Sequence, residues 1–421
     1  MIAITALASV SAVGQDSAAV LFTNCILHTG TGTTYSEGAI GMKNGKITYA
    51  GRAVAAPKTG FTKTTDLKGK HVYPGLIAMN TTLGLTEIFA VRATNDYKEA
   101  GRMNPNVRAL SAYNAESEIT ATVKANGVLF AQICPRGGVM SGTSSVVVLE
   151  GNNWEDAAYR ADEGIHLNWP RMYKYSGDEE DPEAYIPDED YGKNMQELRT
   201  FFEKAKAYAK RSFPLERDLR FEALRGVFEG EKRLYVHADF IKALREITLF
   251  KKDFEIEKLT VAGGEDAWMA ADLLRENGVS VLVKRVNSLP RFAEDDIDGS
   301  FTLPAKLAAA GVDFCFQTGG SMEPMQNRNI AFNAGTAVGY GLDREAAIKA
   351  LTLTPAEVLG IDSRTGSLEP GKEANFIITS GDLLDMRQSH VEAMYFRGQS
   401  LPLKTRQEEL FEKYTAPANV R

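Results

Sequence analysis

Hydrophobic and polar positions follow different periods in different parts of this chain, and each period predicts a different kind of element. Residues 18–72 contain short apolar runs that alternate with polar positions and break at glycines, which predicts strands joined by turns. Within this region, Asn44-Gly45 lies between two β-rich runs in GAIGMKNGKITYAG. An Asn-Gly pair in this setting predicts a type I′ hairpin, because both residues tolerate positive φ angles.

From residue 233 onward, strand-like runs alternate with amphipathic helical patterns. RLYVHADF leads into IKALREITLF, KLTVAGGEDA leads into WMAADLLRENG, and the helical AKLAAAG leads into VDFCFQTGG. The last helix is predicted over REAAIKALTLTPAEVLG. This alternation is typical of βα units and predicts a parallel sheet closed into a barrel.

The middle of the chain is less regular. GVLFAQICP (127–135) predicts a strand, and residues 191–211 and 217–231 have the apolar spacing of amphipathic helices. Residues 152–232 are interpreted as an insertion in the barrel, and the polar stretch 85–114 as a long loop on the side of the barrel mouth.

A glycine-rich stretch, PRGGVMSGTSSVVVLEG (135–151), invites comparison with phosphate-binding loops. Consecutive backbone N–H groups can cradle an anion. However, no Gly-Lys-Ser or Gly-Lys-Thr follows, which excludes a P-loop. We therefore predict a loop between strands, with a ligand-lining role left open.

Composition limits the classes of protein that fit. The 421 residues are 44% hydrophobic, enough for one barrel of roughly 250–300 residues and a smaller domain. The net charge of −7 argues against a nucleic acid or an anionic membrane as the main partner. Part of the acidic excess lies in DEEDPEAYIPDED (178–190), which predicts a solvated loop and, as a second interpretation, a cation- or partner-binding loop.

The N-terminus and the cysteines bear on the compartment. Residues 1–17 are apolar and small before they turn polar, and Ala12-Val13-Gly14 resembles a cleavage site, so we predict a signal peptide remnant and an exported, periplasmic or secreted protein. No other apolar stretch of about 20 residues occurs, so no membrane span is expected. The three cysteines form no CxxC pair and suggest neither a disulfide framework nor a cysteine zinc site.

Residues 72–85, VYPGLIAMNTTLGL, resemble a segment of the amidohydrolase superfamily, the metal-dependent hydrolases with a (β/α)8 barrel. In that family the segment reads Pro-Gly-Leu-Ile-Asp-x-His-x-His and ends the first barrel strand. This chain keeps the Pro-Gly-Leu-Ile part, but Ala78 stands for the Asp, Asn80 for the first His and Thr82 for the second. Within the superfamily the chain is most similar to the imidazolonepropionase-like group.

The resemblance implies an α/β fold, with a (β/α)8 TIM-like barrel and a small discontinuous β-sandwich formed by both chain ends. The sandwich is assigned to residues 18–72 and 365–421, and the barrel to 73–364 with the insertion at about 152–232. The C-terminal part of the sandwich is expected in GSLEPGKEANFIITSGDLLD (366–385) and AMYFRGQSL (393–401).

The resemblance also identifies the other positions where the family has metal ligands. His237, in YVHADF, matches the His that ends the fifth strand. Gly263 stands for the His of the sixth strand, and Gly319, after Gln317, for the Asp of the eighth. Only one of five identifiable ligands is therefore kept, whereas a hydrolytic zinc needs about three protein ligands. No cofactor is expected, and zinc or another divalent metal would require new ligands.

Three functions remain open. The family implies a hydrolase of non-peptide C–N bonds, which needs new ligands beside His237, for example Asp239, Glu87 or Glu265. A non-catalytic barrel would instead bind a small ligand at a mouth lined by the residues at the former ligand positions, by Gln317 and by the 136–145 loop. A structural subunit would form a homo-oligomer or pair with a metal-competent paralogue.

The remaining histidines and a metal-free mechanism complete the candidates. His237 and Asp239 lie two residues apart on one strand face, so a metal-free acid–base mechanism is conceivable. His237 is otherwise interpreted as a strand-end histidine that is satisfied by hydrogen bonds. The other four histidines have no ligand role by resemblance; they map to the sandwich or its edges (His28, His71, His390) and to the insertion (His166).

Overall fold

The computed structural model describes residues 19–175, 185–211, 216–292, 294–320 and 322–415. The predicted leader at 1–17 lies outside these ranges, as does most of the acidic stretch at 178–190.

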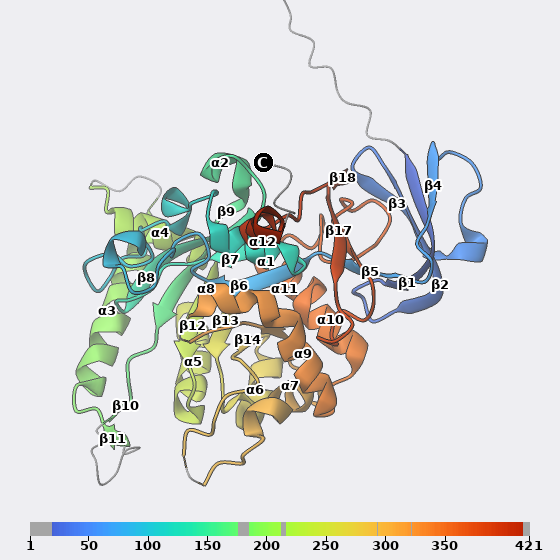
Figure 1. The fold of residues 1–421 in the computed structure, drawn as a ribbon. Coiled ribbons are helices and arrows are strands. Elements are labelled where there is room, and N and C mark those ends of the chain that lie inside the picture. Colours follow the sequence, from blue (N-terminus) through green and yellow to red (C-terminus); the bar gives the residue numbers. More distant parts are fainter. Residues whose placement is uncertain (1–18, 176–184, 212–215, 293, 321, 416–421) are drawn as a thin grey trace, which may run out of the picture.

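The larger part of the molecule is a nearly closed barrel of eight strands surrounded mainly by helices (Figure 1). The strands follow one another around the barrel in chain order: β6 (Leu76–Thr81), β7 (Val128–Ile133), β8 (Met140–Val148), β9 (Ala158–Asn168), β12 (Arg233–Ala238), β13 (Leu259–Gly263), β14 (Ser280–Val283) and β15 (Phe314–Phe316). A parallel bridge between Met79 and Gln317 joins the two edge strands. The predicted α/β class and barrel are confirmed at this level.

The prediction of a loop at 135–151 is wrong, because residues Met140–Val148 form the barrel strand β8. It pairs antiparallel with both β7 and β9, so the barrel is not entirely parallel. All nine residues of β8 are buried, and its last three are the β-branched Val146–Val148. A strand that is buried on both faces lacks the apolar–polar alternation of a half-exposed strand, and the glycines before it suggested a turn.

Strand β9 lies inside the stretch that the sequence assigned to an insertion. It pairs with β8 and, in parallel, with β12, so residues 158–168 belong to the barrel. The inserted part is therefore smaller than 152–232. It includes the hairpin of β10 (Tyr173–Tyr175) and β11 (Tyr185–Pro187), and the packed helices α3 (Tyr191–Ala209) and α4 (Leu219–Phe228).

Helices follow the later barrel strands as the sequence predicts. After β12 comes α5 (Ile241–Phe254), which buries six side chains along one face. The helices that follow are η4 (Ala267–Ala270), α6 (Ala271–Glu276), α7 (Gly299–Ala309), α8 (Glu323–Gln326), η5 (Asn327–Asn329) and α9 (Ile330–Gly339). The predicted last helix is two helices, α10 (Arg344–Leu351) and α11 (Leu353–Leu359), because Thr352 between them leaves the helical conformation (φ −133°, ψ −76°).

A second sheet of eight strands combines both ends of the chain. Its strands are β1 (Val20–His28), β2 (Thr34–Lys43), β3 (Lys46–Arg52), β4 (Lys63–Asp66), β5 (His71–Pro74), β16 (Phe376–Thr379), β17 (Val391–Phe396) and β18 (Gln399–Ser400). The predicted hairpin is confirmed: Asn44 and Gly45 join β2 to β3 with φ angles of 53° and 74°. A separate cluster of buried side chains from both chain ends forms the core of this sheet.

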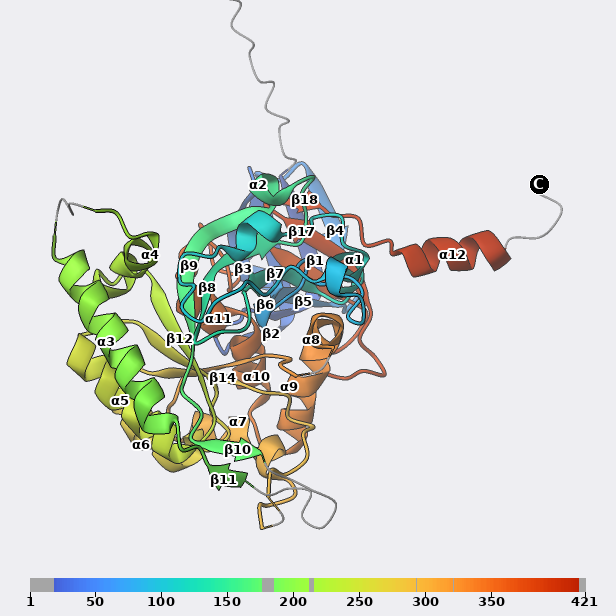
Figure 2. The same cartoon turned by 90° about the vertical axis from the view of Figure 1, so that its left-hand side faces the viewer.

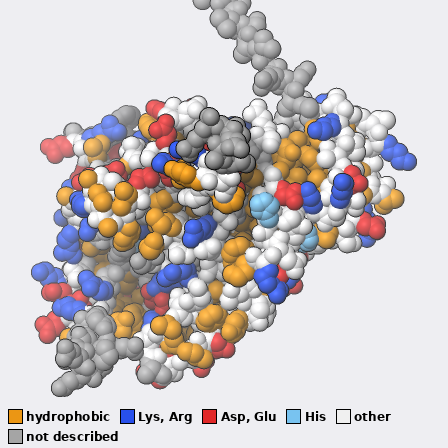
Figure 3. All heavy atoms as spheres, in the orientation of Figure 1, with side chains coloured by type: hydrophobic (Ala, Val, Ile, Leu, Met, Phe, Trp, Pro, Cys, Tyr) orange, Lys and Arg blue, Asp and Glu red, His pale blue; other side chains and the backbone are white. Residues whose placement is uncertain are grey.

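The remaining described helices are short or lie at the surface. Helix α1 (Glu118–Ala125) precedes β7, and α2 (Trp154–Ala157) precedes β9. Helix α12 (Arg406–Thr415) projects from the body and buries none of its residues (Figure 2). Figure 3 shows charged and hydrophobic side chains interspersed over one face of the molecule. Within the described residues, no helix combines the length and the apolar character that crossing a membrane requires.

Candidate functional site at the barrel mouth

The carboxyl ends of several barrel strands surround an open cavity of about 500 Å³. Five of the six residues that the sequence singled out line it: Asn80, His237, Gly263, Gln317 and Gly319. Thr82 is buried beside them but does not line the cavity. The charged side chains of the lining are Arg136, Asp239, Lys284 and Arg285.

Asn80, at the end of β6, is buried and has a positive φ of 53°. Asparagine tolerates this conformation better than most residues do. Its backbone N–H donates to Gln132 Oε1 at 3.0 Å, and its side-chain amide donates to Gln317 Oε1. Both sides of the amide are in use, because the Asn80 Oδ1 atom accepts from the guanidinium of Arg136.

Arg136 also lines the mouth, and the sequence did not single it out by name, although the 136–145 segment was considered as lining. It lies in the short connection between β7 and β8. Its guanidinium donates to Asn80 Oδ1 at 2.5 Å, to the Asn80 main-chain oxygen at 2.6 Å and to Cys134 Sγ at 2.9 Å. A fixed positive charge therefore lies directly against Asn80, the residue that the resemblance aligns with the family's first ligand.

Thr82 donates hydrogen bonds to a buried carboxylate, that of Glu323, which the sequence gave no reason to expect. Its backbone N–H and its hydroxyl both donate to Glu323 Oε2, at 3.0 and 3.1 Å, and Asn327 donates to Glu323 Oε1 at 3.1 Å. Glu323 is 4% exposed, and its carboxylate lies 3.8 Å from the Arg136 guanidinium. The hydroxyl of Thr82 thus faces α8 rather than the cavity.

His237 has a partner that the sequence missed. His166, assigned to the insertion, lies on barrel strand β9, and its Nδ1 is 3.0 Å from His237 Nε2. Burial lowers the pKa of His237 to about 3, with further lowering by the charges of Arg136 and Lys284. Burial also lowers the pKa of His166, so both imidazoles are neutral near pH 7. His166 was hard to detect because polar residues such as Glu163 interrupt the apolar pattern of β9.

Below the mouth, the barrel interior contains a buried carboxylate, Glu163. Its oxygens accept hydrogen bonds from Gln132 Nε2 at 2.7 Å, Ser144 Oγ at 2.5 Å and the Tyr235 hydroxyl at 2.9 Å. Burial raises the pKa of Glu163, and the three donors oppose that rise. Gln132 also accepts from the Asn80 N–H, so the network extends from the interior to the mouth.

Two acids that the sequence offered as new metal ligands are instead paired with a lysine. Lys284, after β14, lies 2.6 Å from Asp239 Oδ2 and 2.7 Å from Glu265 Oε1. Arg291 makes a further ion pair with Glu265, at 2.6 Å. The third candidate, Glu87, accepts from Asn114 at 3.0 Å and does not line the cavity.

Arg285 is different from the other cations of the mouth. Within the part of the chain that the structure describes, its guanidinium has neither an ion pair nor a hydrogen-bond partner, and its Nε is buried. The charge of Lys284, in contrast, is offset by two carboxylates. Arg285 is therefore the cation at the mouth that is free to pair with an incoming anion.

The two glycines that the resemblance aligns with metal ligands differ in the space around them. Gly263 has a φ of +113°, and a Cβ atom there would lie 2.4 Å from Asp239 Oδ1. A Cβ atom on Gly319 would have Gln317 Oε1 as its nearest neighbour, at 3.4 Å. Nowhere among the described residues do three or more His, Cys, Asp or Glu side chains form a group that could hold a metal ion.

Comparisons with known proteins agree with this architecture. Residues 237–402 match the model of the amidohydrolase family. An amidohydrolase from Thermotoga maritima is 24% identical, with a TM-score of 0.76 over 91% of this chain and 99% of its own. An adenosine deaminase from Xanthomonas campestris with bound zinc is 16% identical, with a TM-score of 0.55 over 93% of this chain and 94% of its own.

A Xaa-Pro dipeptidase with bound methionine is 15% identical, with a TM-score of 0.57 over 91% of this chain and 99% of its own. No curated protein sequence matches the chain. The family match covers the later barrel strands and the C-terminal part of the second sheet, and the three solved structures show that the chain shares their fold.

Proposed function

We propose that this protein binds a small anionic molecule at its barrel mouth and does not carry out metal-dependent hydrolysis. The observation that carries the proposal is the position of Arg136, whose guanidinium is bonded to Asn80 where the family has a metal ligand. This chain would therefore not catalyse the hydrolysis of non-peptide C–N bonds, which is the activity that the family resemblance implies.

The donor groups do not fit a hydrolytic zinc. The amide of Asn80 and the hydroxyl of Thr82 are weaker zinc ligands than imidazole, and both are engaged with other side chains. The Nε2 atom of His237 faces His166 rather than open space. The positive charge of Arg136 would also repel a divalent cation, because the guanidinium stays protonated near pH 7. The adenosine deaminase with bound zinc shows that this type of barrel can hold the metal in a relative.

The charge of the lining favours an anion. Three cations and one carboxylate line the cavity, and His237 is neutral near pH 7. Arg285 has no carboxylate partner among the described residues, and a guanidinium binds carboxylates through paired N–H donors. The sheet that joins both chain ends supports, as a further part of the proposal, the composite β-sandwich domain that the resemblance implies.

Metal content tests the first half of the proposal. The purified protein is treated with a mild chelator, replenished with zinc or manganese, and measured by elemental mass spectrometry. We expect well below one metal per chain, and no change on His237→Ala. About one tightly held metal per chain that is lost in His237→Ala would overturn the proposal and restore the hydrolase.

Thermal shift tests the second half. Propionate is compared with propionamide, which has a similar shape but no charge. We expect propionate to raise the melting temperature and propionamide to have no effect. Arg285→Gln should abolish the shift, whereas the exposed Arg387→Gln should keep it. Equal shifts with both compounds would contradict the proposal.

A further inference from the structure

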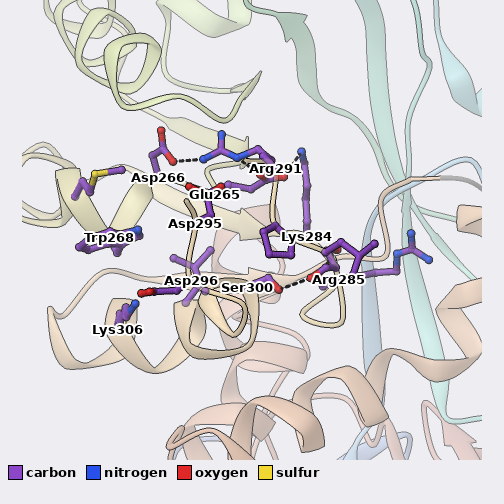
Figure 4. A pocket seen from close by; sticks show the side chains of 16 residues that line it. Glu265, Asp266, Trp268, Lys284, Arg285, Arg291, Asp295, Asp296, Ser300 and Lys306 are labelled. Atoms are coloured by element: carbon purple, nitrogen blue, oxygen red, sulfur yellow. Dashed lines mark hydrogen bonds and ion pairs between the residues drawn. The ribbon is translucent and has the colours of Figure 1, made fainter. Parts of the chain in front are cut away.

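Beside the mouth lies a second, smaller chamber of about 130 Å³, between η4 and α7 (Figure 4). It shares Lys284, Arg285 and Ser288 with the mouth cavity. A molecule bound to Arg285 in the mouth therefore has this chamber as its immediate neighbour. Figure 4 shows Trp268 and Lys306 on one side of the chamber and Arg285 on the opposite side.

The chamber has an apolar wall that contains an indole. Trp268 is 48% exposed, and its neighbour Met269 is 46% exposed. The side chains of Leu289, Pro290 and Leu303 complete the apolar lining. Exposed apolar side chains that gather in a concave site, rather than singly, are typical of ligand pockets. The ammonium of Lys306 lies 4.8 Å from the centre of the Trp268 ring and holds the indole from the side of α7.

The acidic residues of the chamber limit what that wall can receive. Asp295 and Asp296 line the chamber, and neither has an ion pair within the described ranges. Arg291, on the same wall, is already paired with Glu265 and Asp266. Asp295 and Asp296 would therefore repel a second carboxylate on the ligand, whereas they would not repel an uncharged group.

We infer that the molecule bound at the mouth is an organic acid with one carboxylate, paired with Arg285, and one uncharged apolar group, packed against Trp268. The inference rests on the anion-binding function proposed above, and it adds the apolar half of the ligand. Burying a phenyl-sized group against an indole should raise affinity by at least about tenfold over the same acid without it.

Calorimetric titration of the full chain with three acids tests the inference. Propionate carries the carboxylate alone, 3-phenylpropionate adds an apolar ring, and glutarate adds a second carboxylate. We expect 3-phenylpropionate to bind at least about tenfold more tightly than propionate, and glutarate no more tightly than propionate. Trp268→Ala should reduce the affinity for 3-phenylpropionate to that for propionate and leave propionate binding unchanged.

Tryptophan fluorescence gives a second readout that does not depend on Trp268→Ala being well folded. The wild-type emission should change with 3-phenylpropionate but not with propionate. Trp154→Phe should keep this change, because Trp154 packs against the barrel core away from the chamber. Trp268→Phe should lose it while it keeps much of the affinity, since a smaller ring remains.

The outcomes separate the two proposals. If none of the three acids binds, the anion-binding function fails and the inference fails with it. If propionate binds but the ring adds no affinity, or adds affinity that Trp268→Ala does not remove, the inference alone fails. Glutarate that binds as tightly as 3-phenylpropionate would also overturn the inference.

Discussion

Arg136 and Asn80 form a closed pair at the barrel mouth, in which one guanidinium bonds both the side-chain and the main-chain oxygen of the same residue, at 2.5 and 2.6 Å. Both oxygens belong to a buried residue in a left-handed conformation. The pair therefore fixes the end of β6 and at the same time places a positive charge beside a residue that the resemblance aligns with a metal ligand.

Removing this guanidinium should destabilise the fold. Arg136→Met keeps most of the side-chain length but removes the guanidinium donor of the Asn80 main-chain oxygen and leaves Asn80 Oδ1 with only the weak thiol donor of Cys134. Buried acceptors without a partner cost about 1–3 kcal/mol, so we expect a loss of that size in the free energy of unfolding, measured by urea denaturation. Arg387→Met, at an exposed ion pair, is the control and should change it by less than about 0.5 kcal/mol. Equal losses in both variants would contradict a structural role of the pair.

The two glycines at the barrel mouth, Gly263 and Gly319, should respond differently to substitution by alanine. Gly263→Ala forces a side chain onto a φ of +113° and against Asp239 Oδ1, which should cost about 1–3 kcal/mol. Gly319→Ala meets its nearest atom at 3.4 Å and should be tolerated. Melting temperatures of the two variants test this, and a Gly263→Ala variant as stable as the wild type would show that the strand end can relax.

The buried Glu163 should tolerate glutamine and not leucine. Glu163→Gln keeps one oxygen for Gln132 and Ser144, and its amide can donate to the Tyr235 hydroxyl, which can also accept. Glu163→Leu removes the acceptor of the Tyr235 hydroxyl and leaves Gln132 and Ser144 with only their longer contacts, at 3.5 Å to Ser144 Oγ and 3.3 Å to the Gly164 oxygen, so it should cost about 1–3 kcal/mol.

The pH dependence of Glu163 gives the same comparison a second readout. Because burial raises its pKa, the wild type loses stability from this group as the pH rises through the raised value. Glu163→Gln removes that loss, so its stability relative to the wild type should be higher at pH 8 than at pH 4, as measured by urea midpoints. The opposite order would mean that the carboxylate is stabilised as the anion.

Acid should destabilise the protein through its neutral histidines. Burial lowers the pKa of His71 to about 4 and of His237 to about 3, from an ordinary value of 6.5. Below pH 6.5 the unfolded chain binds protons that the folded chain does not, so stability falls from about pH 6.5 towards pH 4. His237→Asn should reduce this fall, as measured by urea midpoints across the range. An unchanged slope in the variant would assign the fall to other groups.

Local chemistry made some elements predictable from the sequence. The hairpin at Asn44-Gly45 follows from the φ preferences of two residues, and the βα units after residue 233 follow from clear changes of period. Strand β8 was not predicted because it is buried on both faces and therefore lacks the alternation of apolar and polar residues. Strand β9 was not predicted because two of its buried residues, Glu163 and His166, are polar and interrupt the apolar pattern by which a strand is recognised.

The sequence predicted which residues lie at the candidate site, but not which side chains they contact there. The resemblance identified Asn80, His237 and the two glycines, and the structure brings them to one cavity. Arg136 and Glu323 had no such signal, because their roles depend on which side chains the fold places opposite them. Long-range pairs such as Arg136–Glu323 and His166–His237 are properties of the closed barrel, not of any local window.

The antiparallel placement of β8 has a consequence for how the chain folds. Strands β7, β8 and β9 form a meander whose partners are close in sequence, whereas barrel closure joins Met79 to Gln317 across most of the chain. Contacts between nearby residues cost less loop entropy and tend to form sooner. We therefore expect pulse-labelled hydrogen exchange to show protection in the meander before it appears at Met79 and Gln317. Simultaneous protection would mean that the barrel closes in one step.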